Sequence, residues 1–326
     1  MFHAKLPRHV AAGVLVLTLT LGASLLGRTS ALAQGKPDIA WMVGGHSGGV
    51  SSVALSPDGQ TLATASFDTS VKLFNLTSGL LMHTLTGHSV AALSVAFSPD
   101  GTRVATGGYE GNVIVWDTAT GLPVAVLSGH TDGVFGLDYS HDGTMIASAS
   151  ADGTVKTWNA ANGSLIRTLV GHTDWVYAVA FSPDDTVLAS ASGDATIRLW
   201  RVSDGASLGT LAGHTGFVLS LAFSPSGDTL ASSSTDNSTR LWRMSDGAEI
   251  GTFTGQTLYV YDVAFSPDGT RLASGAGDGT IVIRTVADGA VERTIPLPVG
   301  VLSLAYAADG GTIFAGSTEG SSMDSS

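Results

Sequence analysis

From residue 38 onward the chain alternates short apolar segments with polar turns. The stretch from Trp175 to Gly213 is representative: WVYAVAF, TVLASAS, ATIRLWRV and ASLGTLAG follow one another, separated or bounded by Gly, Pro, Asp or Ser. Segments of this length that are rich in β-branched and apolar residues predict β-strands. The pattern therefore predicts units of four strands each.

The units repeat with a fixed period of 42 residues, marked by three phrases that keep register with one another. Gly-His pairs begin at Gly45, Gly87, Gly129, Gly171 and Gly213, and Gly255-Gln256 continues the series. A turn phrase, SPDG in its commonest form, begins at Ser56, Ser98, Ser140, Ser182, Ser224 and Ser266. A turn acid occupies Asp68, Glu110, Asp152, Asp194, Asp236 and Asp278, and six residues later stand Phe74, Trp116, Trp158, Trp200, Trp242 and Arg284. Because a four-stranded unit cannot cover both of its faces, such units are expected to stack radially.

The combination of Gly-His, a turn acid and a following Trp resembles the WD-repeat family. The literal Trp-Asp dipeptide occurs at Trp116-Asp117, and variants such as Trp158-Asn159 and Trp200-Arg201 replace it elsewhere. The resemblance implies an all-β fold, a β-propeller of four-stranded antiparallel blades. The repeats are expected at about 46–87, 88–129, 130–171, 172–213, 214–255 and 256–297, with a weak repeat at 298–326 and a strand at 38–44.

The weak last repeat leads to an expectation of seven blades with an incomplete closing blade. Residues 301–306 and 311–316 match the first two strands of a unit, but no apolar segment follows them to supply a third. Ile39, Trp41 and Val43 alternate as an outer strand should. The resemblance implies that this N-terminal strand closes the ring.

Ser, His and Asp recur together, which raises the question of a catalytic triad. A triad needs one site with an oxyanion hole and a cleft, whereas this set occurs once per unit at the same spacing. The resemblance implies instead a structural hydrogen-bond chain from the Trp indole to Ser, His and Asp, which would pair buried polar atoms internally. Complete sets are His130, Ser148, Asp152 and Trp158; His172, Ser190, Asp194 and Trp200; and His214, Ser232, Asp236 and Trp242.

The other units carry this set incompletely. In the first unit Phe74 cannot donate to Thr64, and the second has Glu110 for the acid, with His88, Thr106 and Trp116. The sixth has Gln256 and Arg284 and is expected to keep only Ser274 and Asp278. Since each lost hydrogen bond weakens its blade, the sixth and closing blades should exchange amide hydrogens fastest.

The N-terminus has the layout of a secretory signal peptide. Lys5 and Arg8 precede an apolar run at 10–26, and the small-residue pattern Ala-Leu-Ala follows at 31–33. Cleavage is expected after this pattern, which divides the chain into a signal peptide at 1–33 and a propeller at 34–326. An uncleaved anchor helix is the alternative. The protein is therefore expected to be exported, either periplasmic or secreted.

The composition limits the classes of partner and cofactor that the protein is expected to bind. The net charge is −12 and Lys and Arg do not cluster, so an acidic surface would repel nucleic acid. The chain has no cysteine, which excludes disulfides and thiolate metal sites. No cofactor or metal is expected. His83 and His141 lie outside the Gly-His series and are interpreted as isolated surface histidines.

Large aromatic residues mark departures from the repeat. In the family the positions before and within the first strand, and before the turn acid, lie near one face of the ring. The residues expected on this face are Phe67, Tyr109, Phe135, Trp175, Tyr177, Phe217, Tyr259 and Tyr261, with Asp132, Asp174 and Asp262 adding acidity between them. Aromatic residues with polar tips are typical of binding hot spots. The alternative is that they pack against neighbouring loops.

The sequence thus predicts a non-catalytic scaffold or binding module, a monomer that binds protein partners outside the cytoplasm. A carbohydrate-binding propeller is the first alternative, because aromatic platforms also stack on sugar rings. A propeller hydrolase is the second; Asp262 is the single unrepeated acid expected near the channel, too little for paired acid–base chemistry.

Overall fold

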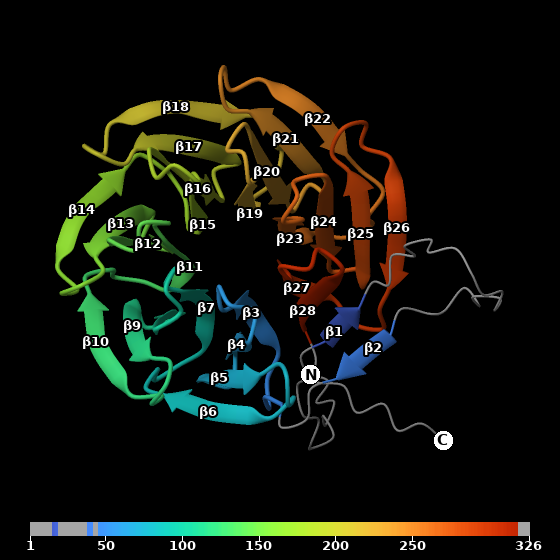
Figure 1. Ribbon diagram of the computed structural model, residues 1–326. Helices are drawn as coiled ribbons and strands as arrows, with labels where there is room; N and C mark the ends of the chain where they lie inside the picture. Colours follow the sequence, from blue (N-terminus) through green and yellow to red (C-terminus); the bar gives the residue numbers. More distant parts are fainter. Residues whose placement is uncertain (1–14, 19–37, 42–44, 319–326) are drawn as a thin grey trace, which may run out of the picture.

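In the computed structural model, which describes residues 15–18, 38–41 and 45–318, four-stranded antiparallel sheets are arranged as a ring around a central channel (Figure 1). The regular elements of these described residues are β-strands. The predicted all-β propeller with four-stranded antiparallel blades is confirmed.

Six blades each consist of four strands that are consecutive in the chain, and successive strands pair from the channel outward. The first blade contains β3 (Val50–Leu55), β4 (Thr61–Ser66), β5 (Ser70–Asn75) and β6 (Leu81–Thr86). The second contains β7 (Ala92–Phe97), β8 (Arg103–Gly108), β9 (Asn112–Asp117) and β10 (Pro123–Ser128). The third contains β11 (Val134–Tyr139), β12 (Met145–Ser150), β13 (Thr154–Asn159) and β14 (Leu165–Val170).

The remaining three continuous blades follow the same plan. The fourth contains β15 (Val176–Phe181), β16 (Val187–Ser192), β17 (Thr196–Arg201) and β18 (Ser207–Ala212). The fifth contains β19 (Val218–Phe223), β20 (Thr229–Ser234), β21 (Thr239–Arg243) and β22 (Glu249–Phe253). The sixth contains β23 (Val260–Phe265), β24 (Arg271–Ala276), β25 (Thr280–Thr285) and β26 (Val291–Pro296).

One further sheet joins the two ends of the chain. Its strand order is β2-β1-β28-β27, formed by β27 (Val301–Tyr306), β28 (Thr312–Ser317), β1 (Leu15–Thr18) and β2 (Asp38–Trp41). β1 lies antiparallel between β28 and β2, so that Leu15 is opposite both Ala315 and Trp41. We call this composite sheet the joining sheet.

The joining sheet corrects the expectation of a seventh blade that lacks its third strand. Six blades are continuous in sequence, and the joining sheet has four strands, because residues 15–18 take the third place. Sequence analysis assigned those residues to the signal peptide. An apolar run of Leu, Val and Thr fits a strand as well as a leader, and periodicity alone does not separate the two.

The recurrent turn phrase is explained by its side-chain hydrogen bonds. In the third blade Ser140 Oγ donates to Asp142 Oδ1 over 2.7 Å and accepts the N–H of Met145 over 2.9 Å. Gly143, the last residue of the phrase, has φ +71°, a conformation that costs glycine little. The phrase therefore connects the first two strands of a blade at a fixed geometry.

The core lies between the blades. The second strand of each blade carries small buried residues, for example Ala147 and Ala149, which allow the next blade to approach closely. Val179, Leu188 and Trp200 of the fourth blade pack in the same cluster. Each blade thus buries the face that its neighbour leaves open, as radial stacking requires.

Candidate functional site

The third, fourth and fifth blades each contain the four-residue hydrogen-bond chain that the family resemblance implies. In the fourth blade the Trp200 indole donates to Ser190 Oγ over 2.8 Å, and His172 Nε2 lies 2.8 Å from the same oxygen. His172 Nδ1 lies 2.8 Å from Asp194 Oδ2. Corresponding contacts of 2.8–2.9 Å join His130, Ser148, Asp152 and Trp158, and His214, Ser232, Asp236 and Trp242.

Electrostatics fit a structural role for this chain. Burial lowers the pKa of His172, although Asp194 acts in the opposite direction. Burial alone would raise the pKa of Asp194, but hydrogen bonds from Thr196, His172 and the N–H of Thr173 hold it below its usual value. The imidazole is therefore neutral and the carboxylate ionised, each paired inside its own blade. The histidines do not meet in one cleft, which a triad would need.

The incomplete units pair their polar atoms in other ways. The prediction that the sixth blade keeps only Ser274 and Asp278 of the set is wrong, because Gln256 also takes part. Ser274 Oγ donates to Gln256 Oε1 over 2.8 Å, and Gln256 Nε2 donates to Thr280 Oγ1 over 3.1 Å. The amide has both a donor and an acceptor, so it replaces the histidine. Arg284, in place of Trp, donates to the Thr254 carbonyl over 2.8 Å.

Seven of the eight predicted aromatic residues contact one another in two groups. A chain of ring contacts with centroid distances of 5.3–6.3 Å runs from Tyr109 through Phe135, Trp175 and Tyr177 to Phe217. Tyr259 and Tyr261 form a separate pair at 6.3 Å. The side chains of Phe67, Tyr109, Trp175, Phe217 and Tyr259 are 40–50% exposed, and those of Phe135, Tyr177 and Tyr261 are half-buried. We call these eight residues the aromatic face.

Two of the three acids assigned to this face belong to its loops. Asp132 and Asp174 each accept the N–H of the following residue over 2.7 Å. Asp262 lies on the channel wall, where one was expected, and pairs between blades: Ser220 Oγ and the N–H of Leu304 donate to its two oxygens over 2.5 and 2.6 Å. The expectation that it is the single unrepeated acid there is wrong, because Asp138 also lines the channel. Exposed Leu258, beside Tyr259, was missed, since one Leu in a variable loop gives no periodic signal.

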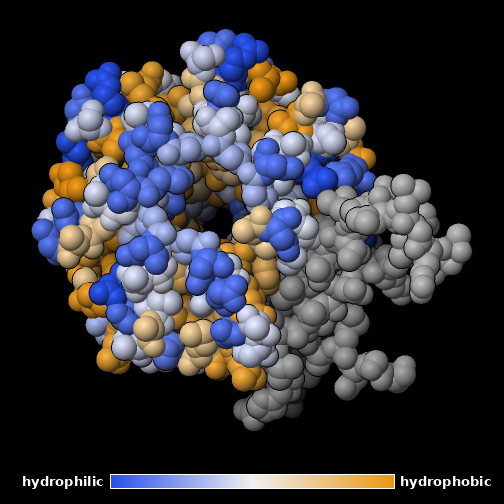
Figure 2. Space-filling model, viewed as in Figure 1, coloured by the Kyte–Doolittle hydropathy of each residue, from blue (hydrophilic) through white to orange (hydrophobic). Residues whose placement is uncertain are grey.

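The channel contains two connected cavities, and Figure 2 shows the hollow at its centre. The smaller, of about 220 Å³, is lined by Phe135, Tyr177 and Tyr261 of the aromatic face. The larger, of about 760 Å³, shares Asp262 and Leu304 with the smaller one and extends toward the SPDG turns. The aromatic face therefore surrounds one mouth of the channel.

The two histidines outside the series are not isolated. His83 Nε2 lies 3.0 Å from the Ala119 carbonyl. His141, in the turn phrase of the third blade, lies with Nδ1 3.1 Å from Asp185 Oδ1 of the fourth. Since Asp185 is distant in sequence, only folding brings this pair together.

Among residues 15–18, 38–41 and 45–318, no group of three or more His, Asp or Glu side chains has a geometry that could hold a metal ion. The same part of the chain contains no helix long and apolar enough to cross a membrane.

The family model "WD domain, G-beta repeat" matches the chain six times, at residues 40–75, 79–117, 121–159, 163–201, 205–243 and 247–284. The chain belongs to the WD40 repeat family. WD40 propellers typically mediate protein interactions and are generally scaffolds without catalytic activity. A search of curated proteins gives no significant match to this chain. From the second onward, each matched repeat covers the outermost strand of one blade and the three inner strands of the next, so that β26, β27 and β28 follow the last match.

Proposed function

We propose that this WD40 propeller is a non-catalytic module that binds a protein partner through its aromatic face, outside the cytoplasm. The observation that carries this proposal is the unbroken series of ring contacts from Tyr109 to Phe217, in which exposed loop residues alternate with half-buried residues of the innermost strands. Clustered exposed aromatic residues are typical of interaction sites, because they bury much area at little entropic cost. The repeat does not need them: the first unit has Gly49 where the fourth has Trp175.

Capture of partners by crosslinking in the native cell tests the proposal. The variant Trp175→Ala/Phe217→Ala/Tyr259→Ala removes three exposed rings from three blades. A matched control, Leu208→Ala/Ile250→Ala/Val291→Ala, removes three similarly exposed apolar side chains from the outer strands. We expect the first variant to lose specific partners and the control to keep them. The same set of partners captured by both would contradict the proposal.

Carbohydrate binding is a second candidate, because Phe135 and Trp175 are stacked at an interplanar angle of 21° and Tyr177 and Phe217 at 22°. Flat aromatic platforms of this kind also stack on sugar rings. A glycan array with wild type and the triple aromatic variant separates the two candidates. Specific glycan signals that the variant loses would favour carbohydrate; no signal, together with captured proteins, favours the leading proposal.

The proposal that the protein is exported rests on the first 33 residues, in which a basic start is followed by an apolar run and then by small residues. N-terminal sequencing of the protein recovered outside the cytoplasm should begin at Gln34. Recovery of uncleaved chain with the cell membrane would favour the anchor instead. Cleavage would also remove β1 from the joining sheet. We further propose a monomer that does not bind nucleic acid, which light scattering and a mobility-shift assay test.

A further inference from the structure

Three positions of the repeat are uniform in five of the first six units and different in one, and the three exceptions gather at one end of the channel. The exceptions are Asp138, His141 and Asp185. The counterparts of Asp138 are Ala54, Ala96, Ala180, Ala222 and Ala264. Those of His141 are Pro57, Pro99, Pro183, Pro225 and Pro267, and those of Asp185 are Gly59, Gly101, Gly143, Gly227 and Gly269.

Two of the exceptions depend on each other. Asp185 has φ +56°, a left-handed conformation that its glycine counterparts adopt without a Cβ. Its carboxylate accepts the N–H of His141 over 2.8 Å and the N–H of Asp142 over 2.9 Å. Proline at 141 would have no N–H to donate. The pair therefore fixes the imidazole at the edge of the larger cavity.

With Nδ1 so close to Asp185 Oδ1, the favoured tautomer donates from Nδ1. Nε2 is then left as a hydrogen-bond acceptor. In this tautomer the imidazole offers a hydrogen-bond acceptor beside Asp138, which lines the same cavity.

The third exception adds an ionisable side chain that the ring does not need. Asp138 lies on the innermost strand of the third blade, and its Oδ2 accepts the N–H of Phe181 over 2.7 Å. Burial raises the pKa of Asp138 to about 7. The other five units have Ala here and the same blade geometry, so the carboxylate is not a requirement of blade packing.

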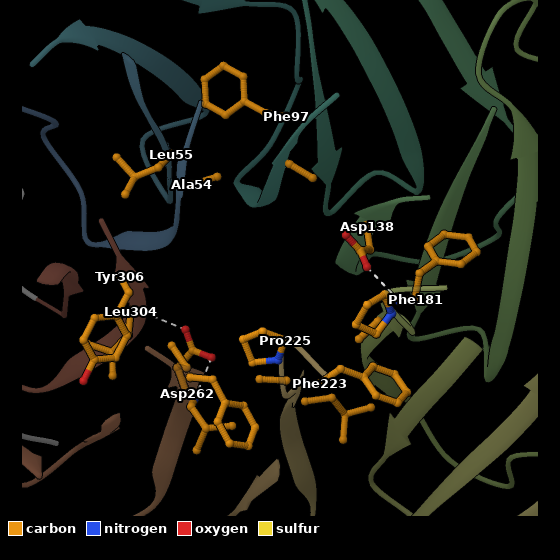
Figure 3. Close-up of a pocket in the computed structure, with 18 of the residues that line it drawn as sticks. Ala54, Leu55, Phe97, Asp138, Phe181, Phe223, Pro225, Asp262, Leu304 and Tyr306 are labelled. Carbon is orange, nitrogen blue, oxygen red and sulfur yellow. Dashed lines mark hydrogen bonds between the residues drawn. The ribbon is translucent and has the colours of Figure 1, made fainter. Parts of the chain in front are cut away.

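The cavity around these groups is large, has both polar and apolar lining, and is short of positive charge. Inner strands of the six blades and the joining sheet line its 760 Å³, a volume in the range of small-molecule sites. Figure 3 shows Phe97, Phe181 and Phe223 around it, with Asp138 and Asp262 on different sides. Its lining residues include these two carboxylates and no Lys or Arg.

The two carboxylates differ in how many hydrogen bonds they accept from the protein. Asp262 accepts hydrogen bonds from Ser220, Leu304 and the N–H of Val263 on its two oxygens, and burial raises its pKa. Asp138 has fewer donors. A positive charge beside Asp138 would therefore be attracted to a carboxylate that the protein compensates less than Asp262.

We propose that the channel end lined by Asp138 and His141 binds a small organic cation, an amine with an apolar body. The ammonium group lies against Asp138 and donates to His141 Nε2, while the body packs against the accessible apolar side chains of the wall, Leu55, Phe223 and Pro225. Charge complementarity selects the cation, and the apolar part of the wall selects the body. The site is distinct from the aromatic face, so it does not depend on partner binding there.

Calorimetric titration of the full chain tests this with phenethylamine as the probe and 2-phenylethanol as its uncharged counterpart. We expect the amine to bind about tenfold or more tightly than the alcohol, as a charge-assisted hydrogen bond implies. Equal affinities for amine and alcohol would overturn the proposal.

Substitutions taken from the other repeats keep the fold. Asp138→Ala installs the residue of five other units and should weaken amine binding about tenfold while leaving the alcohol unchanged. Asp184→Ser, which copies Ser226, removes an exposed acid on the same face that does not line this cavity and should leave amine binding unchanged. Undiminished amine binding by Asp138→Ala, or equal loss in both variants, would refute a specific site.

Discussion

The fourth and sixth blades have the same strand order and pairing but different buried polar groups. In the fourth, Ser190 lies between the Trp200 indole and His172. In the sixth, Ser274 contacts Gln256, and an arginine that reaches a loop carbonyl replaces the tryptophan. Both blades pair these polar atoms, so the fold tolerates a change of residues provided that buried donors and acceptors remain satisfied.

The fourth blade also buries a larger apolar side chain than the sixth. Trp200 is almost fully buried and contributes to the core shared with the third blade. Arg284 is partly exposed and stacks near Phe253, with its guanidinium carbon 5.3 Å from the ring centroid. The sixth blade is therefore connected by fewer buried groups, and it should be the less stable of the two.

The largest expected effect comes from removing the central hydroxyl of the complete chain. Ser190→Ala leaves the Trp200 indole and His172 Nε2 without their partner and should lower the free energy of unfolding by about 3 kcal/mol. Ser274→Ala in the sixth blade leaves one amide oxygen unpaired and should cost about 1 kcal/mol. Urea unfolding measures both variants. Equal losses of unfolding free energy would contradict the proposed difference between the two blades.

Acid should destabilise the fourth blade more than the sixth. Burial lowers the pKa of His172 below that of an unfolded histidine, so between these two values the unfolded chain binds a proton that the folded blade does not. Stability is therefore full above pH 6.5 and declines as the pH falls. The same applies to His46, His130 and His214, whereas Gln256 does not titrate.

Amide exchange measured at two pH values near and below 6.5 tests this for each blade, with His172→Gln as the control. The substitution should remove the acid sensitivity of β15–β18 and leave that of the third and fifth blades. Acid sensitivity in β23–β26 equal to that in the wild-type β15–β18 would contradict the assignment.

At neutral pH the strands of the sixth blade and the joining sheet should exchange amide hydrogens faster than β11–β22. A difference of about 1 kcal/mol in local opening corresponds to roughly a fivefold difference in exchange rate. Mass-spectrometric exchange of the intact chain resolves the blades as peptides. Slower exchange in β23–β26 than in β15–β18 would show that the chain of polar contacts does not control local stability.

The smallest effect is expected in the second blade, where Glu110 is longer than the usual acid and its Oε2 is buried without a partner. Glu110→Asp should raise the free energy of unfolding by about 1 kcal/mol because it removes that unpaired oxygen. Thermal unfolding measures this change in stability. Asp152→Glu in the third blade is the reverse substitution and should lower the stability. The opposite signs for the two variants would be the clearest support.

Much of the fold could be predicted because the residues that define each blade lie close together in the sequence and recur in every unit. The strands and the SPDG turns followed from the repeating pattern of each unit. The recurrence of Ser190, Asp194 and Trp200 at the same spacing after His172 showed that they form a set, and the family resemblance implied the hydrogen bonds within it. The period showed that the aromatic residues occupy equivalent positions of different blades, and the resemblance implied that these positions share one end of the ring.

Contacts between blades could not be predicted in this way. The period states where a residue lies within its own blade, but the approach of neighbouring blades depends on the size and packing of whole faces. Only the tertiary structure placed Asp262 between Ser220 and Leu304, brought His141 to Asp185, and inserted residues 15–18 beside β28. The sequence determined the repeating unit, and the three-dimensional packing decided which exceptions to it meet.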